Sequence, residues 1–347
     1  MQRLLRGWLL YAIFGVLIGL LYVRAVPVKF GAATVGVVEA PSQKHALEWW
    51  PSNLDAAAFK QAAARSPAMA CALSLLTVIM AGLGVGGLAV TLRALGNGRI
   101  RDVWRFPSAR LPAWTFEELG RITLLTVMIA MLLPFARLSF LFDELDGQPD
   151  THLWLTLSMC VLDVFVIVAI LAFALGKDAS LRQTFGVSRG ELAARLSIAF
   201  RAYLAAFPWL FLLLFLLVEG ARAFGLKPPI EPIQQLIFQE HRPIILALTV
   251  ILACVIGPLA EELFSRGVVY AAIRRRTSRV AAILASGAAF SALHANPVGF
   301  LPIMALGCLL AYRYERTGSL VSSVAVHIMH NTLLLSLALA FRLLMAA

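Results

Sequence analysis

Long apolar segments alternate with short polar connections along this chain, and the pattern predicts helices that cross a membrane. A membrane-spanning helix needs about 20 mainly apolar residues, because the hydrocarbon core of a bilayer is about 30 Å thick. The sixth apolar segment is longer than one crossing needs, and the eighth is short. The nine predicted segments are 7–24, 67–92, 120–142, 152–176, 198–219, 243–275, 279–294, 297–313 and 319–345.

The composition supports this interpretation. Of the 347 residues, 60% are hydrophobic and only 14% are charged, whereas an ordinary soluble domain has about 25% charged residues. The mean hydropathy is +0.83. We therefore predict an all-α fold, a polytopic transmembrane helical bundle of about 8–9 membrane helices surrounded by the lipid bilayer.

The basic residues predict how the bundle is oriented. The net charge is +11, but the lysines and arginines gather in connections between apolar segments, at 93–110, 177–195 and 274–279. By the positive-inside rule these connections are cytoplasmic, which places the N-terminus in the cytoplasm and the C-terminus outside a bacterial-type inner (plasma) membrane. No nucleic-acid partner is expected, because the sequence has no basic groove with interleaved aromatic residues.

Two regions are predicted along the chain. Residues 1–239 form N-terminal membrane helices, with an extracytoplasmic loop near 27–66 that is the longest non-spanning stretch. Residues 240–347 are predicted to form a catalytic membrane domain, because the polar side chains that could take part in a reaction gather there.

The most informative polar residues are Glu261, Glu262 and Arg266, inside the sixth apolar segment. A charged side chain at this depth costs about 2.5 to 3.5 kcal/mol on insertion scales, so it needs a partner or a watery cavity. Glu262 and Arg266 are four residues apart and can form an ion pair on one helix face, whereas Glu261 is rotated by about 100°. Gly257-Pro258 lies one turn upstream, where the missing N–H would open the backbone.

Three other polar residues are predicted to reach a similar level, near or past the middle of the hydrocarbon core. Counting about 1.5 Å per residue from the connections puts Glu261 and His294 about 21 to 22 Å deep, His327 about 12 Å and Asn331 about 18 Å. A carboxylate, an imidazole and two neutral donors at one level suggest hydrolysis of an acyl bond. Glu261 would be the general base on a water that His294 helps to hold, and His327 with Asn331 would stabilise the oxyanion.

The residues also resemble a known family, the CPBP family, also called the Abi or type II CAAX prenyl endopeptidase family. Its three motifs correspond here to Glu261-Glu262-x-x-x-Arg266, Phe290-x-x-x-His294 and His327-x-x-x-Asn331. The resemblance covers about residues 240 to 345. It implies an intramembrane glutamate-type endopeptidase with Glu261, His294, His327 and Asn331 as catalytic residues, supported by Glu262 and Arg266. It also implies a membrane-associated or lipidated protein or peptide as substrate, because family members process prenylated C-termini, bacteriocin leaders or signalling peptides.

Other functions use the same residues. Glu261, Glu262, His294 and His327 are plausible ligands for a divalent metal that would activate the water. No H-E-x-x-H motif is present, so we expect no cofactor while leaving this alternative open. Buried carboxylates and histidines also relay protons in transporters, but the chain shows no repeated halves. A non-catalytic membrane scaffold is the remaining alternative.

Several nearby residues are predicted to be structural. Phe290 is expected to pack, and His330 to point away from the site because it is rotated by about 100° from Asn331. Asp163 lies inside the fourth apolar segment and is a functional candidate by its depth, but a partner such as Arg137 or Arg201 would explain it equally, so it is left out of the site. The glycines expected to let helices approach closely are Gly82, Gly84, Gly86 and Gly87.

Overall fold

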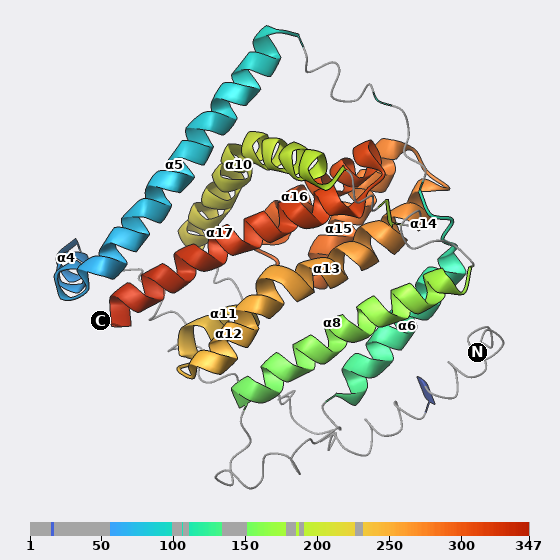
Figure 1. The fold of residues 1–347 in the computed structure, drawn as a ribbon, viewed down its shortest axis with the longest axis horizontal. Helices are drawn as coiled ribbons and strands as arrows, with labels where there is room; N and C mark the ends of the chain where they lie inside the picture. The colour runs from blue at the N-terminus through green and yellow to red at the C-terminus, as the bar shows by residue number, and fades with distance from the viewer. Residues whose placement is uncertain are drawn as a thin grey trace, which may run out of the picture.

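The computed structural model describes residues 15–16, 56–98, 106, 111–133, 151–177, 185–186, 191–225 and 232–346. Every regular element in this part of the chain is a helix (Figure 1). The helices are α4 Ala56–Arg65, α5 Pro67–Gly96, α6 Phe116–Leu132, α8 Thr151–Leu175, α10 Leu192–Ala223, α11 Pro232–Gln239, α12 Pro243–Ile251, η3 Leu252–Ile256, α13 Gly257–Glu262, η4 Leu263–Tyr270, α14 Ala271–Arg274, α15 Arg279–Leu293, α16 Phe300–Thr317 and α17 Leu320–Ala346.

The all-α polytopic prediction is confirmed. Within the described ranges, five helices are long and apolar enough to cross a membrane: Pro67–Gly96, Thr151–Leu175, Leu192–Ala223, Pro243–Arg274 and Leu320–Leu344. Many large apolar side chains on these helices are exposed, as lipid-facing residues would be. The chain is therefore an integral membrane protein. Its orientation and the division at residue 240 stay predictions.

Two predicted segments fall wholly or largely outside the described residues. They are the first span, 7–24, and the loop near 27–66, of which the described part is the helix α4 and Ser66. The third span begins at Phe116, because Thr115 and Glu118 form a reciprocal capping box that starts α6 there. Its predicted end at 142 also lies outside the described part.

α17 occupies the centre of the bundle. It contacts α5, α10, α13, η3 and α16, and Figure 1 shows it crossing the middle of the molecule with α5 at one edge and the α6–α8 pair at the other. The continuous helix Pro243–Arg274 packs against both α17 and α8. The helix that carries the two glutamates is therefore covered from both sides.

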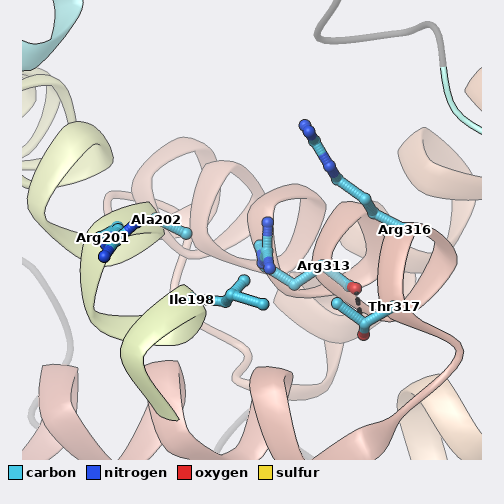
Figure 2. Close-up of a pocket in the computed structure, with 6 residues that line it drawn as sticks. All are labelled: Ile198, Arg201, Ala202, Arg313, Arg316 and Thr317. Atoms are coloured by element: carbon cyan, nitrogen blue, oxygen red, sulfur yellow. Dashed lines mark hydrogen bonds between the residues drawn. The ribbon is translucent and has the colours of Figure 1, made fainter. Parts of the chain in front are cut away.

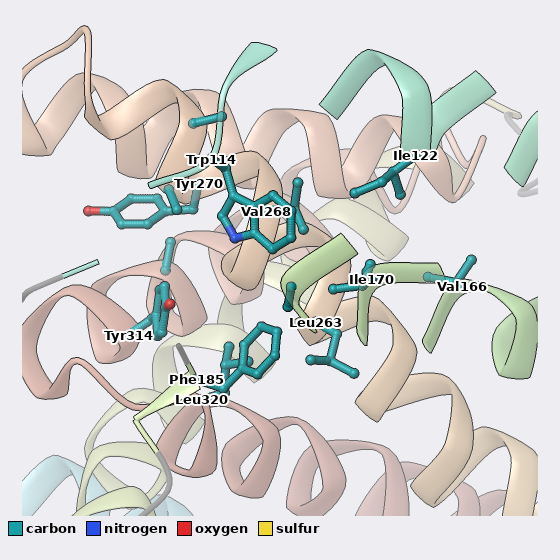
Figure 3. Close-up of a cluster of buried hydrophobic side chains, with 14 of the residues drawn as sticks. Trp114, Ile122, Val166, Ile170, Phe185, Leu263, Val268, Tyr270, Tyr314 and Leu320 are labelled. Carbon is teal, nitrogen blue, oxygen red and sulfur yellow. The ribbon is translucent and has the colours of Figure 1, made fainter. Parts of the chain in front are cut away.

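The largest buried cluster surrounds the C-terminal half of that helix (Figure 3). Beside it, Glu315 of α16 is fully buried and accepts hydrogen bonds from Tyr270 Oη at 2.9 Å and Arg279 Nε at 3.0 Å. These bonds tie the end of η4 and the start of α15 to α16. The labelled members of the cluster are Trp114, Ile122, Val166, Ile170, Phe185, Leu263, Val268, Tyr270, Tyr314 and Leu320.

A second polar cluster lies at the other end of the Pro243–Arg274 helix. The buried carboxylate of Glu240 accepts hydrogen bonds from Arg242 Nε at 2.9 Å and from His152 Nδ1 at 3.2 Å. The Arg242 side chain thereby lowers the pKa of the Glu240 carboxyl from 4.5 to about 2. Arg342, near the end of α17, donates to the Ile237 carbonyl at 2.6 Å. This cluster joins α8, α11 and α17.

Close approach of α5 and α10 depends on one glycine. A Cβ on Gly87 would lie 2.2 Å from the Leu204 carbonyl oxygen and 2.6 Å from Pro208 Cδ. At Gly86 the nearest atom would be a flexible one, Leu204 Cδ1 at 3.3 Å. The prediction of close packing therefore applies to Gly87 and, less strictly, to Gly86.

Alanine at Gly87 should lower the free energy of unfolding by about 1–3 kcal/mol, because the added methyl meets backbone that cannot move without separating the helices. Chemical unfolding of the purified protein in detergent measures this. Gly84→Ala is the matched control, since a Cβ at Gly82 or Gly84 meets nothing within 4 Å, which contradicts the packing role predicted for these two glycines. Equal stability of the two variants would show that α5 and α10 do not pack through Gly87.

Candidate active site

The helix that carries the glutamates is distorted where the site begins. Two π-helical segments, η3 and η4, flank the six-residue helix α13. The Gly257 N–H donates to the Leu252 carbonyl, five residues earlier. In this register the Ala253 carbonyl would pair with residue 258, but Pro258 has no N–H. Insertions of this kind are frequent at functional sites. The disturbed backbone predicted at Gly257-Pro258 is therefore present.

Asn331 supplies the hydrogen bond that Pro258 cannot donate to the Ala253 carbonyl. Its Nδ2 donates to the Ala253 carbonyl at 2.9 Å from the neighbouring helix α17. Asn331 therefore has a structural role in this state, holding the π-helical segment to α17. The amide has a second hydrogen that makes no hydrogen bond with the described residues.

Glu262 and Arg266 form the predicted ion pair, and both side chains have no exposed surface. Arg266 Nη1 lies 2.7 Å from Glu262 Oε1, and its Nη2 donates to the Gly307 carbonyl of α16 at 2.9 Å. Glu262 Oε1 also accepts from His327 Nδ1 at 3.0 Å. Because a carboxylate paired with arginine only accepts, the His327 ring carries its hydrogen on Nδ1. The pair therefore sets the orientation of His327.

Glu261 points elsewhere, toward two imidazoles. Its Oε2 lies 3.9 Å from His294 Nε2 and 3.8 Å from His327 Nε2. Its side chain is 37% exposed, in contrast with the fully buried neighbour Glu262. The two adjacent glutamates thus differ as the helical rotation predicts: one is locked in an ion pair, and the other faces the histidines.

His294 is held in one tautomer by its own helix. It ends α15, and its Nδ1 donates to the Phe290 carbonyl at 2.9 Å. Since a carbonyl only accepts, the Nε2 that faces Glu261 has a lone pair in the neutral ring. The next residue, Ala295, has φ 49°, a left-handed conformation that is rare for a residue with a Cβ. The chain therefore turns sharply just behind the histidine.

Phe290 packs between the polar groups. Its ring centroid is 4.8 Å from that of His294 and 5.7 Å from that of His327, and the Arg266 guanidinium lies 4.4 Å from it. A cation over an aromatic face is stabilised, more so when water is excluded. Phe290 therefore fixes the positions of both histidines, as a packing residue would.

α15 and α16 approach closely beside this ring. A Cβ on Gly307 would lie 3.0 Å from the Cα of Gly287 and 3.1 Å from Phe290 Cδ1. The two glycines let α16 come near enough for its Gly307 carbonyl to reach Arg266. The small residues at this crossing thus allow a hydrogen bond that stabilises the buried Arg266 guanidinium.

Three buried polar atoms of the site make no hydrogen bond with the described part of the chain. They are Glu261 Oε2, Glu262 Oε2 and Arg266 Nε. Buried polar atoms in native proteins nearly always have a partner, so each exception needs an explanation. Of these, Glu261 Oε2 lies between two histidine nitrogens, where a small polar molecule such as water could bind and donate a hydrogen bond to it.

Asp163 also lies near this site; the sequence interpretation names it as a functional candidate by its depth but leaves it out of the site. A Cβ on Gly257 would lie 3.5 Å from Asp163 Oδ2 and 3.8 Å from Glu261 Oε1, so α8 brings a second carboxylate to the same glycine. Asp163 forms no ion pair with Arg201, and Arg137 lies outside the described residues. Its depth in an apolar segment marks it as a candidate, but only the structure brings it beside Gly257 and Glu261.

His330 does not join the site. Its Nδ1 lies 3.2 Å from the Tyr203 hydroxyl, and the two rings meet edge to face at 5.9 Å. It binds α17 to α10, as expected for a structural residue. Among the residues that the structure describes, no group of three or more histidine, cysteine or acidic side chains has the arrangement of a metal site.

Comparison with known proteins adds to this geometry. Residues 243–333 match the family model described as Type II CAAX prenyl endopeptidase Rce1-like. The proposed membrane peptidase YdiL of Bacillus subtilis (strain 168) is 31% identical over 85 residues, which are 24% of this chain and 35% of that protein. The chain thus spans about a third of the length of that curated relative. No solved structure matches it significantly. The matched segment contains all three sequence motifs, so the similarity to this family lies in the part of the chain that carries the candidate site residues.

Proposed function

We propose that the chain is an intramembrane endopeptidase that hydrolyses a peptide bond with a water activated by Glu261. One observation supports this most strongly: Glu261 Oε2 is buried without a hydrogen bond in the described part of the chain and lies 3.9 Å from His294 Nε2. The match of residues 243–333 to the endopeptidase family model supports the reaction class. The residue roles are our inference from the geometry.

The separation of the two groups suits a bridging water. At 3.9 Å the carboxylate and the imidazole are too far apart for a direct hydrogen bond. A water between them could donate one hydrogen to Glu261 Oε2 and the other to the lone pair on His294 Nε2. Its own lone pairs would then point toward a substrate carbonyl carbon. Because Glu261 and His294 both accept hydrogen bonds from this water, they raise the electron density on its oxygen and make it a better nucleophile.

The proton transfers balance around Glu261. As the water oxygen bonds to the carbonyl carbon, its proton passes to Glu261 and the carbonyl becomes an oxyanion. When the C–N bond breaks, the same proton passes to the leaving amine, and the oxyanion returns to a carbonyl. The products are a carboxylic acid and an amine, and Glu261 is again ionised.

The oxyanion needs hydrogen-bond donors, and α17 offers two. His327 Nδ1 is already engaged with Glu262, so Nε2 donates only when the ring is doubly protonated. The imidazolium would lie between two carboxylates, Glu261 and Glu262, which compensate its charge. Asn331 would contribute the second hydrogen of its amide, while the first holds the Ala253 carbonyl.

The surroundings favour a substrate with an apolar part. An apolar cavity of about 690 Å³ lies between α8, α10, α13 and α17. Leu259 and Leu263, on the helix of the two glutamates, line it together with Ile328, next to His327. Cavities of this size and character hold small apolar molecules. The substrate would therefore be a membrane-associated or lipidated protein or peptide.

The experiment that tests this function compares the membrane peptides of a strain lacking the chain with those of its parent. We expect at least one uncleaved membrane protein or peptide in the mutant, and processing restored by the wild-type gene and not by Glu261→Gln. Restoration by both genes would favour a scaffold, since a scaffold does not need the carboxylate. Activity of the purified protein that is lost with a chelator and recovered with a divalent ion would replace the metal-free mechanism by the metal-dependent alternative.

A further inference from the structure

A basic cavity separate from the proposed active site lies between α10 and α16. Its volume is about 380 Å³. Figure 2 shows α10 on one side and α16 on the other. The lining residues are Ile198, Arg201, Ala202, Arg313, Arg316 and Thr317. Each helix contributes residues spaced three and four apart, so both triplets lie on single faces that point toward the same space.

Half of this lining is arginine, and no described acidic residue belongs to it. Arg313 is only 5% exposed, yet its Nε and Nη2 reach only the Ser322 hydroxyl, each at 3.4 Å. Arg201 makes no hydrogen bond or ion pair with the described residues. A buried guanidinium without an anionic partner is unfavourable. Within the part of the chain that the structure describes, the positive charge of the cavity is therefore uncompensated.

Structural explanations account for only part of this arrangement. A helix C-terminus attracts cations, which explains Arg316 in the last turn of α16. Arg316 also donates to the Tyr312 hydroxyl at 2.6 Å. Neither effect explains why Arg201, on the other helix, faces the same space, or why Arg313 is buried there without a carboxylate.

The length of α10 also allows the cavity to reach the level of a lipid headgroup. α10 has 32 residues, which is about 48 Å at 1.5 Å per residue, whereas the hydrocarbon core is about 30 Å thick. An excess of about 18 Å must therefore lie outside the hydrocarbon core. Arg201 is about 14 Å from the start of that helix, so it reaches the headgroup region when most of this excess lies at the same end. The neighbouring contact of Arg195 Nη1 with the Thr317 carbonyl, at 3.5 Å, places this end of α10 beside the end of α16.

We propose that this cavity binds the phosphate of an anionic phospholipid headgroup. Guanidinium groups bind phosphate oxygens in pairs with good geometry. Ile198 and Ala202 offer an apolar wall for the beginning of an acyl chain. The bound lipid would clamp α10 to α16, the helix whose Gly307 carbonyl reaches Arg266. A free phosphate shares the same chemistry and is the alternative source of the anion.

Thermal unfolding of the purified full chain in neutral detergent tests the proposal. Phosphatidylglycerol should raise the unfolding midpoint by on the order of 5 °C, because it binds the folded state. Phosphatidylcholine should leave the midpoint unchanged, and inorganic phosphate should produce less than half the shift. An equal shift with inorganic phosphate, and no addition from the lipid, would overturn the lipid as occupant.

The variant Arg201→Gln/Arg316→Gln should lose most of the phosphatidylglycerol shift. Both side chains are exposed, so the fold should persist. Arg276→Gln is the matched control, because Arg276 lies at the same end of the bundle and stacks on Phe116 instead of lining the cavity. It should keep the full shift. Equal losses in the two variants would mean nonspecific surface attraction, and an undiminished shift in the double variant would also overturn the proposal.

Discussion

Glutamine in place of Glu261 should slow cleavage of the peptide found by the strain comparison by about 10²- to 10⁴-fold, the usual contribution of a general base. The amide has nearly the same shape but cannot take the proton of a water. Stability should change little, because Glu261 Oε2 has no hydrogen-bond partner in the described structure that the substitution could break. Cleavage rates by mass spectrometry and unfolding midpoints would both be measured.

A matched variant separates chemistry from charge. Glu219→Gln removes one negative charge from an exposed pair with Arg222 on α10, away from the histidines. It should retain the wild-type cleavage rate. If Glu261→Gln cleaves the peptide as fast as Glu219→Gln does, Glu261 is not the base, and the neighbouring carboxylate of Asp163 becomes the next residue to test.

Methionine in place of Arg266 should lower the free energy of unfolding by about 3 to 5 kcal/mol, the cost of leaving one partner of a buried pair uncompensated. Three contacts disappear together: the bond to Glu262, the bond to the Gly307 carbonyl and the stacking on Phe290. Glu262 would remain fully buried, with His327 as its remaining described partner. Chemical unfolding in detergent measures the loss.

The double variant Glu262→Gln/Arg266→Met shows whether the loss comes from the stranded charge. It removes both charges, so at least about half of the lost stability should return. Arg222→Met is the control, because the exposed pair with Glu219 should be worth at most about 1 kcal/mol. A double variant no more stable than Arg266→Met alone would show that packing of the arginine matters more than its charge.

The local features of this protein could be predicted from the sequence because they depend on residues close together in the chain. Helical rotation alone separated Glu262, paired with Arg266, from Glu261. The length of the apolar segments predicted the helices, and counting residues from their ends brought His294 to the level of Glu261. These inferences need only the rise and rotation of a helix, which are the same in every protein.

Tertiary packing decided which polar groups of the site have hydrogen-bond partners from other helices. The α17 helix supplies the Asn331 amide to the carbonyl that Pro258 leaves free, and α8 brings Asp163 beside Gly257. The sequence alone does not distinguish the four glycines of α5, Gly82, Gly84, Gly86 and Gly87. In the structure, α10 comes close to α5 at Gly87 and, less strictly, at Gly86. The sequence determined the helices and the residues that could take part in a reaction. The partners of these residues were decided by contacts between helices far apart in the chain. Such contacts depend on how each helix is shifted and rotated against its neighbour, which the spacing of residues within one helix does not determine.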